Sequence, residues 1–591
     1  MSNGMRSHYC GDIRAGDIDN NVAVCGWIQV RRDHGGVIFL DVRDREGLVQ
    51  VVYEPDNQEV FDRATNLRNE YVIRATGKVR HRGADKINPR LATGEVEILG
   101  ETLEILNSAG GLPFTLDEYS SAGEDIRLRY RYLDLRRPEM QKRLFLRSKI
   151  ASTSRTFLES EGFVEVETPT LTKSTPEGAR DYLVPSRKNP GHFFALPQSP
   201  QLFKQVLMIS GFDRYYQIAR CYRDEDLRHD RQPEFTQIDI EASFVDEFEV
   251  MRVTEGLLRS VFERTLGIDL GDFPVLTYSD AMECYGSDKP DLRIPLVLAG
   301  IDDLVRDLDF NVLARPARDE NGRVSALRVP GGVAKLSRRE IDALVDFARD
   351  HGAEGLAYIK VNDISQGMAG LQSSILKFVD EPTIRAVLEK CKCESGDILF
   401  VGAGHSELVG DFMGALRVQV GHQLRLAAQE HRACWVVDWP MFERTSDGNY
   451  TPAHHPFTRP SCSLEEFASA PHEANAKAYD IVLDGYELGG GSLRIHDVQM
   501  QRAVFDALGM GQEADVKFGF LLDALEMGCP PHGGIALGLD RLAMIVAGAD
   551  SVREVIAFPK TLSATCPLTS APSTIDVGQM RELHLDIRGR K

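Results

Sequence analysis

The first hundred residues consist of short apolar runs separated by turn residues. Positions 22–30 alternate between apolar and polar side chains, and 37–42 and 48–53 are short runs rich in valine and other apolar residues. A helical stretch near 56–70 precedes two more runs of strand character. Three strands, a helix and two further strands are typical of a five-stranded barrel of the OB type, and we expect this fold for residues 1–108.

A different pattern follows the barrel. Residues 109–142 are rich in glycine and then in arginine, which is typical of a hinge. An amphipathic helix is expected after Pro138, ending at Gly162. The apolar positions that share one stripe of this helix are Leu146, Ile150, Phe157 and Leu158.

Helices and strands alternate along the rest of the chain, and we expect a multidomain α+β protein whose main domain has an antiparallel sheet with helices. Residues 285–420 change character and are bounded by proline and glycine, which indicates an inserted α+β domain. The boundaries that we expect are 1–108 for the barrel, 109–142 for the hinge, 143–284 and 421–565 for the two parts of a catalytic core, 285–420 for the insertion and 566–591 for a C-terminal extension.

Composition narrows the class of protein. The chain has 591 residues, and no apolar run approaches the ~20 residues of a membrane helix. The net charge of −20 argues against general adhesion to nucleic acid or to an anionic membrane. Ten cysteines occur without a CxxC pair, so we expect reduced thiols in a cytoplasmic protein and no zinc site.

The outer face of the barrel carries candidate residues for nucleic-acid binding. Phe39 lies on the face opposite Ile38, Leu40 and Val42, the expected core positions. An exposed aromatic ring can stack on an unpaired base, and a neighbouring amide such as Gln50 can bind the edge of that base. The residues proposed for this surface are Arg31, Arg32, Phe39 and Gln50. Taken alone, the pattern also fits a solvated face.

Three separated clusters in the rest of the chain carry chemistry. An apolar strand in 163–182 ends at Pro169; "YRDEDLR" follows a strand at 222–228; and "GGIALGLDRLAM" at 533–544 is a glycine-rich entry to a helix. Neither a Walker A motif nor GxGxxG is present, so a nucleotide would be bound without a P-loop or a Rossmann turn.

These clusters, in this order and spacing, resemble the three motifs of class II aminoacyl-tRNA synthetases. "QSPQLFKQ", "RQPEFTQID", "HHPF", "GYELGGGSLRIH" and "GLDRL" make the chain similar to bacterial aspartyl-tRNA synthetases over nearly its whole length. The chain departs from other class II families at Ala536, where glycine is common. The resemblance implies aspartate–tRNA ligase activity, a barrel that binds the anticodon and an insertion of the GAD-like type.

The resemblance also implies how ATP is held. Arg223 would contact the α-phosphate and the substrate carboxylate, Arg541 the γ-phosphate, and Glu225 the adenine amino group; these three are the expected catalytic residues. Arginine suits this role because its guanidinium binds phosphate through two hydrogen bonds. Further residues assigned to ATP are Asp224, Gln232, Glu487, Gly538, Leu539 and Asp540. Asp480 and Glu487 supply hard oxygen ligands for Mg²⁺ on the phosphates.

Specificity for aspartate needs cations for its side-chain carboxylate. Lys204 and Arg494 are the expected pair, and Asp239 would accept from the substrate's α-ammonium. Ser199 and Pro200 are predicted to be the N-cap and the first residue of the helix that carries Lys204. The remaining residues assigned to the aspartate site are Glu177, Ser199, Gln201, Arg223 and His454. The family also implies a homodimer with Pro169 at its interface.

Other functions remain open on the sequence. One is an asparaginyl or lysyl synthetase; another is an inactive nucleic-acid binder built on the same fold; a third is an asparagine-forming ligase, which would not need the barrel. Some bacterial aspartyl enzymes charge only the aspartate tRNA, whereas others also charge the asparagine tRNA. In this family a histidine at the position of His34 accompanies the relaxed type, and lysine near Asp85 accompanies the strict one. We favour the relaxed type as a hypothesis.

Overall fold

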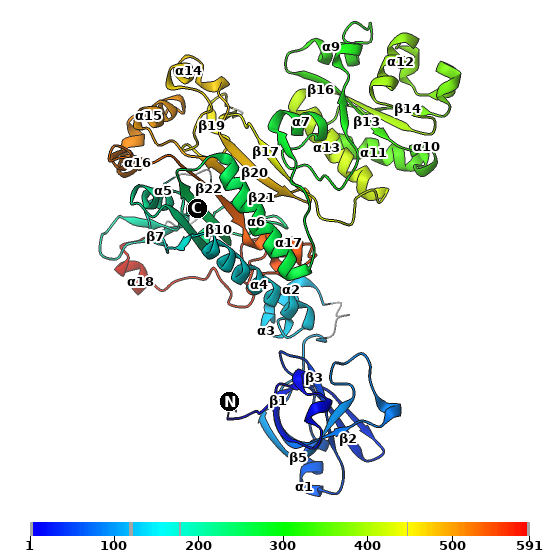
Figure 1. The fold of residues 1–591 in the computed structure, drawn as a ribbon, viewed down its shortest axis with the longest axis vertical. Helices are drawn as coiled ribbons and strands as arrows, with labels where there is room; N and C mark the ends of the chain where they lie inside the picture. The colour runs from blue at the N-terminus through cyan, green and yellow to red at the C-terminus, as the bar shows by residue number, and fades with distance from the viewer. Residues whose placement is uncertain (1–3, 117–121, 176–178, 446, 588–591) are drawn as a thin grey trace. The chain divides into compact units, whose positions relative to one another are not determined.

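The structure is a computed structural model that describes residues 4–116, 122–175, 179–445 and 447–587 (Figure 1). The chain divides into two compact units, Met1–Gln141 and Lys142–Lys591. None of the helices that the structure describes is long and apolar enough to cross a membrane.

The first unit contains the predicted barrel. Its strands close in the order β1-β2-β3-β5-β4, which confirms the OB-type fold. The elements are β1 Asn21–His34, β2 Val37–Arg43, β3 Leu48–Tyr53, α1 Gln58–Thr65, β4 Val72–His81 and β5 Val96–Asn107. Ile38, Leu40 and Val42 are fully buried, as predicted from their two-residue spacing. Gly35 and Gly36 both have positive φ, which lets the tight turn between β1 and β2 form.

The segment predicted to be a hinge is partly helical. It contains α2 Glu124–Arg129 and α3 Arg131–Asp134, and α4 begins at Pro138. Asp134 is fully buried and accepts from Arg131 at 2.5 Å and from Arg137 at 3.1 Å. The arginines of this basic stretch therefore stabilise a local fold around one carboxylate as well as contributing surface charge.

The second unit is built on an eight-stranded sheet with the order β11-β17-β20-β21-β22-β10-β9-β6. Its strands are β6 Val164–Glu165, β9 Arg214–Tyr222, β10 Glu234–Ser243, β11 Val275–Thr277, β17 Ala433–Val437, β20 Ala478–Leu483, β21 Tyr486–Leu493 and β22 His532–Gly538. Among the described strands of this sheet, only the outermost pairs, β11 with β17 and β6 with β9, are parallel. The central strands come from distant parts of the chain, so the sheet gathers the three sequence clusters.

Helices α4 Pro138–Ser160, α6 Glu247–Leu266 and α17 Leu539–Val546 share one large hydrophobic core with this sheet (Figure 1). The predicted stripe of α4 faces that core: Ile150 and Leu158 are fully buried. Remaining elements around the sheet are β7 Leu183–Pro185, β8 Phe193–Ala195, α5 Gln201–Ile209, β18 Phe442–Arg444, β19 Tyr450–Pro452, α14 Leu464–Ser469, α15 Val498–Ala507, α16 Gln512–Leu525 and α18 Val577–Glu582.

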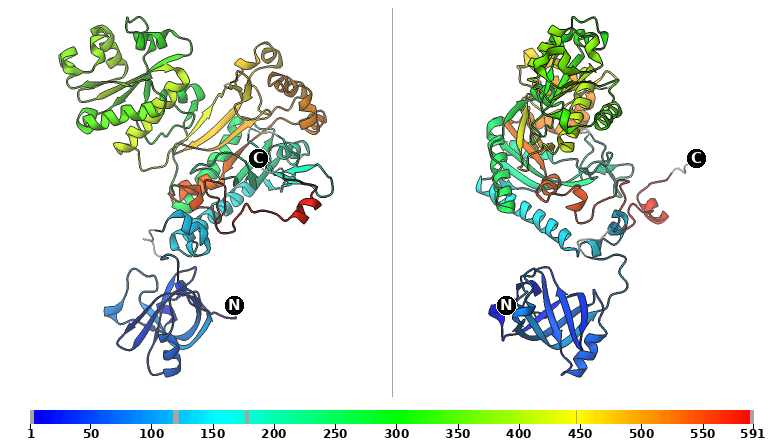
Figure 2. Two further views of the ribbon diagram at one scale, coloured as in Figure 1. Left: turned by 180° about the vertical axis from the view of Figure 1, so that it is seen from behind. Right: turned by 90° about the vertical axis from the view of Figure 1, so that its right-hand side faces the viewer.

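A separate five-stranded antiparallel sheet lies within the segment predicted to be an insertion (Figure 2). Its order is β12-β13-β16-β14-β15, and it shares no described strand with the eight-stranded sheet. The elements are α7 Tyr278–Tyr285, β12 Leu298–Gly300, α8 Asp302–Val305, α9 Asn311–Arg318, β13 Gly322–Val329, α10 Gly332–Lys335, α11 Arg338–Asp350, β14 Ala357–Val361, the 3-10 helix η4 Ile364–Gly370, β15 Leu371–Gln372, α12 Glu381–Lys390, β16 Ile398–His405 and α13 Ser406–Gln423.

Candidate active site

A cavity of about 490 Å³ opens on the eight-stranded sheet and brings the sequence clusters together. Its walls come from the start of α5, the loop between β9 and β10, strands β20 and β21, and the start of α17. The predicted residues that line it are Ser199, Gln201, Lys204, Arg223, Glu225, Gln232, His454, Asp480, Glu487, Arg494, Gly538, Asp540 and Arg541.

Among the described residues, three that were assigned to the aspartate or ATP site are not part of the cavity wall. Asp239 is fully buried behind Lys204, and Leu539 is buried in the helix core. Asp224 donates its main-chain N–H to the carbonyl of Arg180 at 3.0 Å. Glu177 lies outside the described residues.

The predicted start of α5 is wrong by one residue. The helix begins at Gln201 with Pro200 as its N-cap, and the Pro200 side chain makes no capping hydrogen bond. Ser199 instead accepts from the main-chain N–H of Gln201 at 3.3 Å. Lys204 still lies in the first turn of the helix and faces the cavity.

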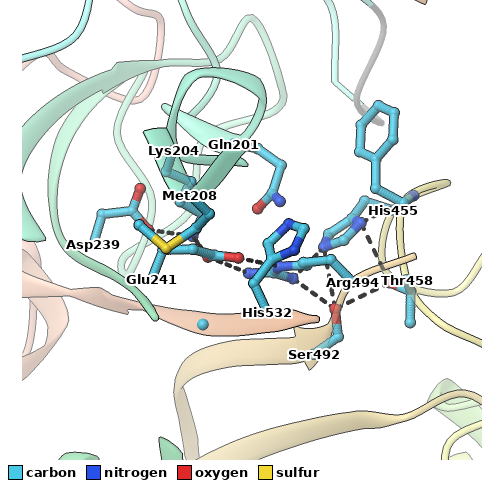
Figure 3. Close-up of polar contacts among 12 residues, drawn as sticks. Gln201, Lys204, Met208, Asp239, Glu241, His455, Thr458, Ser492, Arg494 and His532 are labelled. Atoms are coloured by element: carbon cyan, nitrogen blue, oxygen red, sulfur yellow. Dashed lines mark hydrogen bonds and ion pairs between the residues drawn. The ribbon is translucent and has the colours of Figure 1, made fainter. Parts of the chain in front are cut away.

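Lys204 and Arg494 belong to a continuous buried ion-pair network (Figure 3). Lys204 donates to Asp239 Oδ1 at 2.6 Å and lies 3.1 Å from Glu241 Oε2. Arg494 donates from Nε and Nη2 to the two oxygens of Glu241, at 2.9 and 3.0 Å, and from Nη1 to Ser492 at 2.6 Å. Both cations line the cavity, whereas both carboxylates lie behind them.

The pKa values of the two carboxylates in this network shift in opposite directions. Burial by itself would raise the pKa of Glu241, but Arg494 and Lys204 outweigh it and lower that pKa to about 2. Burial raises the pKa of Asp239, and Lys204 offsets only part of the effect. Asp239 Oδ2 is buried and has no hydrogen-bond partner among the described residues, so it remains available as an acceptor.

Glu241 is a site residue that sequence analysis missed. It lies two residues after Asp239 on β10, so both side chains point to the same face of the sheet. A methyl group at Gly534, on the neighbouring strand β22, would lie 2.1 Å from Glu241 Oε2. The glycine-rich segment before α17 is thus required, at this position, by the close approach of a buried carboxylate.

A second polar group lies at His454, Asp480 and Glu487. His454 Nε2 is 2.9 Å from Asp480 Oδ1. Burial lowers the pKa of His454, but Asp480 outweighs this effect and the pKa is raised. Burial and the charge of Asp480 raise the pKa of Glu487, while Arg541 opposes the change.

Two carboxylates in the wall of one cavity suit a divalent cation. In the part of the chain that the structure describes, no three His, Cys, Asp or Glu side chains lie close enough to hold a metal ion by themselves. Mg²⁺ is commonly bound through one or two carboxylates with phosphate and water oxygens completing its shell. Asp480 and Glu487, which face the same cavity, fit that donor set.

The predicted ATP-binding residues differ in how their side chains are engaged. Arg223 lies over the ring of Phe235, 5.0 Å from its centroid, and Glu225 is 3.4 Å from Arg231. Gln232 is held by two hydrogen bonds to the main chain of Lys560, at 2.7 and 3.1 Å.

Asp540 ties together three elements of the core. Its carboxylate accepts from Arg147 on α4 and, at 2.8 Å, from the main-chain N–H of Thr236 on β10. Because both oxygens are engaged, Asp540 serves the shape of the cavity more directly than it serves a ligand.

On the barrel, two of the predicted base-binding residues, Arg32 and Gln50, are joined by a hydrogen bond. Arg32 donates to Asp41 at 2.8 Å and to Gln50 at 3.3 Å, and Gln50 donates to Glu97 at 2.8 Å. The ring of Phe39 is half-buried and meets His34 edge to face, with centroids 6.1 Å apart.

The two other predicted barrel residues lie apart from this network. Arg31 donates to the carbonyl of Ala64 at 3.2 Å. Asp85 is exposed in a 3-10 turn, Ala84–Lys86, between β4 and β5.

The insertion holds a second cavity of about 610 Å³ between η4 and α12. Its floor is largely apolar, with Met368, Leu371, Ile384 and Leu388 among its residues. None of the residues predicted for catalysis lines it, so the smaller cavity on the eight-stranded sheet is the candidate active site.

Comparisons with known proteins identify the relatives of this chain. Residues 123–562 match the family described as tRNA synthetases class II (D, K and N), and residues 22–106 match the OB-fold nucleic acid binding domain. Asparaginyl-tRNA synthetase from Pyrococcus horikoshii, complexed with asparaginyl-adenylate, is similar at 19% identity and a TM-score of 0.59, over 94% of this chain and 98% of that chain.

Two aspartyl enzymes are similar to about the same degree. A putative aspartyl-tRNA synthetase from Leishmania major matches at 18% identity and a TM-score of 0.57, over 92% of each chain. Aspartyl tRNA synthetase from Entamoeba histolytica matches at 16% identity and a TM-score of 0.57, over 94% of this chain and 92% of that chain. At these identities the likeness establishes the fold and leaves the amino acid open.

Proposed function

The chain belongs to the class II tRNA synthetases of the D, K and N group, which are ligases, and from this premise we propose that its amino acid is L-aspartate. The enzyme would activate aspartate with ATP to aspartyl-adenylate, releasing pyrophosphate, and then transfer the aspartyl group to the 3′ end of tRNA, releasing AMP. The cytoplasm is the expected compartment, where its ten free cysteines would stay reduced.

The pair of cations in the cavity wall supports aspartate over asparagine. Lys204 and Arg494 carry only hydrogen-bond donors, and both face the cavity. A carboxylate offers only acceptors and a negative charge, so it satisfies both cations. The amide of asparagine would bring its N–H donors toward these donors and would lack the negative charge that the two cations attract.

The rest of the cavity supports adenylate formation. Arg223 and Arg541 would neutralise phosphate charge while the carboxylate of aspartate attacks the α-phosphate and pyrophosphate leaves. Asp239, which the resemblance assigns to the substrate's ammonium group, lies behind Lys204 and outside the cavity wall, so it would act by holding Lys204 in place. Mg²⁺, held through Asp480 and Glu487, would supply positive charge to the phosphates.

An exchange assay tests this proposal. We expect aspartate, and neither asparagine nor lysine, to support ATP–pyrophosphate exchange, and Arg223→Ala to abolish exchange while the fold remains intact by circular dichroism. A higher kcat/KM for exchange with asparagine than with aspartate would favour the alternative, an asparaginyl enzyme. The asparaginyl-tRNA synthetase from Pyrococcus horikoshii has a similar fold.

For the tRNA, we propose that the barrel binds the anticodon and that both the aspartate and the asparagine tRNA are charged. His34, at the end of β1, supports the relaxed type through its resemblance to enzymes of that kind. Charging of two purified transcripts with labelled aspartate is the test. Comparable initial rates would support the relaxed type, and charging of the aspartate tRNA alone would show a strict enzyme.

A homodimer is the proposed assembly, with Pro169 at the interface. Val164 and Leu171, on either side of it, are apolar side chains that are 50% and 52% exposed. Apolar side chains exposed at neighbouring positions are typical of an interface. Light scattering after size exclusion should give twice the mass of the 65.8 kDa chain; a monomeric mass would contradict the dimer.

A further inference from the structure

The guanidinium of Arg541 is held before any ligand arrives. Arg541 is the third residue of α17, and its Nη1 donates to the main-chain carbonyl of Glu487 on β21. Its Nη2 donates to Asp230 Oδ2 at 3.2 Å. Asp230 also lines the cavity, and nothing in the sequence analysis assigned it a role.

An acidic side chain in the wall of a site that binds a polyphosphate weakens binding, unless a neighbouring cation compensates its charge. The carboxylate of Asp230 would repel ATP by itself, and its ion pair with Arg541 is 19% and 21% exposed on the two side chains. A cation at the N-terminal end of a helix is also disfavoured by the helix dipole. The pair offsets both effects and fixes the plane of the guanidinium.

The loop that carries Asp230 is itself anchored on both sides. The carbonyl of His229 accepts from the main-chain N–H of Val552 at 3.1 Å and from the hydroxyl of Ser551 at 2.9 Å. Two positions after Asp230, Gln232 is hydrogen-bonded to the main chain of Lys560. Asp230 is therefore presented by a fixed segment of backbone and can orient its partner.

We propose that Asp230 is a positioning residue for ATP, acting through Arg541. Two contacts from different elements engage one Nη1 and one Nη2 hydrogen of Arg541 and leave its other N–H groups to bind phosphate. Asp230 holds the guanidinium in the orientation that ATP requires, so less side-chain freedom is lost when ATP binds. The inference rests on the proposed contact of Arg541 with the γ-phosphate.

The test is a calorimetric titration of the full chain with ATP and Mg²⁺, without an amino acid. Asp230→Asn should raise the Kd for ATP by about tenfold, because the amide pairs weakly with a guanidinium. Asp230→Glu should recover part of the loss. The matched control is Asp226→Asn, a change to an exposed acid on the same loop that does not line the cavity, and it should leave the Kd unchanged.

A double-mutant cycle separates positioning from a general structural effect. In an Arg541→Gln background, Asp230→Asn should weaken ATP binding no further, and the KM for aspartate in pyrophosphate exchange should change in neither single variant of Asp230. Unchanged ATP binding by Asp230→Asn would overturn the inference, since Asp230 would then have no effect on ATP. Tighter binding would also overturn it, since Asp230 would then compete with phosphate for Arg541. A further loss in the Arg541→Gln background would also overturn it. Absence of ATP binding by the wild-type chain would instead refute the proposed function, and the inference with it.

Discussion

The barrel and the catalytic cavity each contain a network of paired charges, but the two networks differ in how far they are exposed to solvent. On the barrel, Arg32 pairs with Asp41 at 2.8 Å, and the two side chains are 39% and 12% exposed. In the cavity, Lys204 and Glu241 are 2% and 0% exposed. Water reaches Arg32, so its pair with Asp41 can be exchanged for contacts to another molecule at a lower cost than a fully buried pair.

The buried network has no such freedom. Removing one member leaves a charge without a partner in a medium of low polarity, which costs about 3–5 kcal/mol. The network therefore acts as a fixed template that presents two cations to a ligand. The comparison teaches that paired charges can serve either adaptable or rigid recognition, and burial decides which.

The largest effect is expected from Lys204→Leu. This change removes one of the two cations that face the ligand and leaves Asp239 without its partner at 2.6 Å. We expect kcat/KM for aspartate in pyrophosphate exchange to fall by about 10³-fold, which corresponds to about 4 kcal/mol. The Kd for ATP should change far less.

A lysine outside the cavity provides the control for that experiment. Lys477 pairs with Glu247 at 2.8 Å and is 38% exposed, so Lys477→Leu removes an ion pair of similar length from the surface. Exchange by Lys477→Leu should stay within about twofold of wild type. Equal losses in the two variants would show that burial does not distinguish the pairs.

The next effect concerns stability. Glu241→Gln removes the carboxylate shared by Lys204 and Arg494, and we expect the free energy of unfolding of the second unit to fall by about 3 kcal/mol in urea titrations. Glu513→Gln on α16 removes a carboxylate that is 71% exposed and screened by water, and should leave the free energy of unfolding nearly unchanged.

The pH dependence of that difference tests its electrostatic origin. The pKa of Glu241 is lowered from 4.5 to about 2 in the folded state, so its contribution is fully present above pH 4.5 and is lost as the pH falls toward 2. The stability gap between wild type and Glu241→Gln should therefore narrow over this window. A gap that stayed constant would point to lost packing in place of lost charge.

Much of the fold was predictable because it rests on local patterns. The two-residue spacing of Ile38, Leu40 and Val42 identified the core face of β2, and the strand–helix order identified the barrel. The sheet order of the second unit was beyond such patterns, because β10 pairs with β22, nearly three hundred residues later in the chain.

The candidate site was predicted unevenly for the same reason. Residues in motifs such as Arg223 and Arg541 do meet in one cavity. Glu241 and Asp230 escaped notice because their roles depend on partners from distant segments, Arg494 and Arg541. Gln50 looked like a free amide, yet its side chain is only 8% exposed and paired on both sides, which no spacing along one strand could indicate.

On the barrel, Phe39→Ala should weaken tRNA charging by about tenfold, because stacking on a base is worth about 1–3 kcal/mol. Pyrophosphate exchange should be unchanged, since Phe39 belongs to the other compact unit. Ile105→Ala removes an apolar side chain on β5 that is 46% exposed and serves as the control. Equal losses of charging and exchange would contradict a role limited to the tRNA.

The smallest effect is expected from His34→Leu, which tests whether the adaptable surface also sets tRNA choice. The ring of His34 meets Phe39 edge to face beside the proposed base-stacking surface, and its nitrogens can donate to or accept from a base, whereas leucine can do neither. One such hydrogen bond contributes about 0.5–1.5 kcal/mol, so charging of the asparagine tRNA relative to the aspartate tRNA should fall about two- to tenfold. Asp33→Asn, a change to the neighbouring exposed acid, should leave this ratio alone. If His34→Leu does not alter this ratio, His34 does not determine which tRNA is charged. The barrel would then bind the anticodon without a contribution of this position to relaxed specificity.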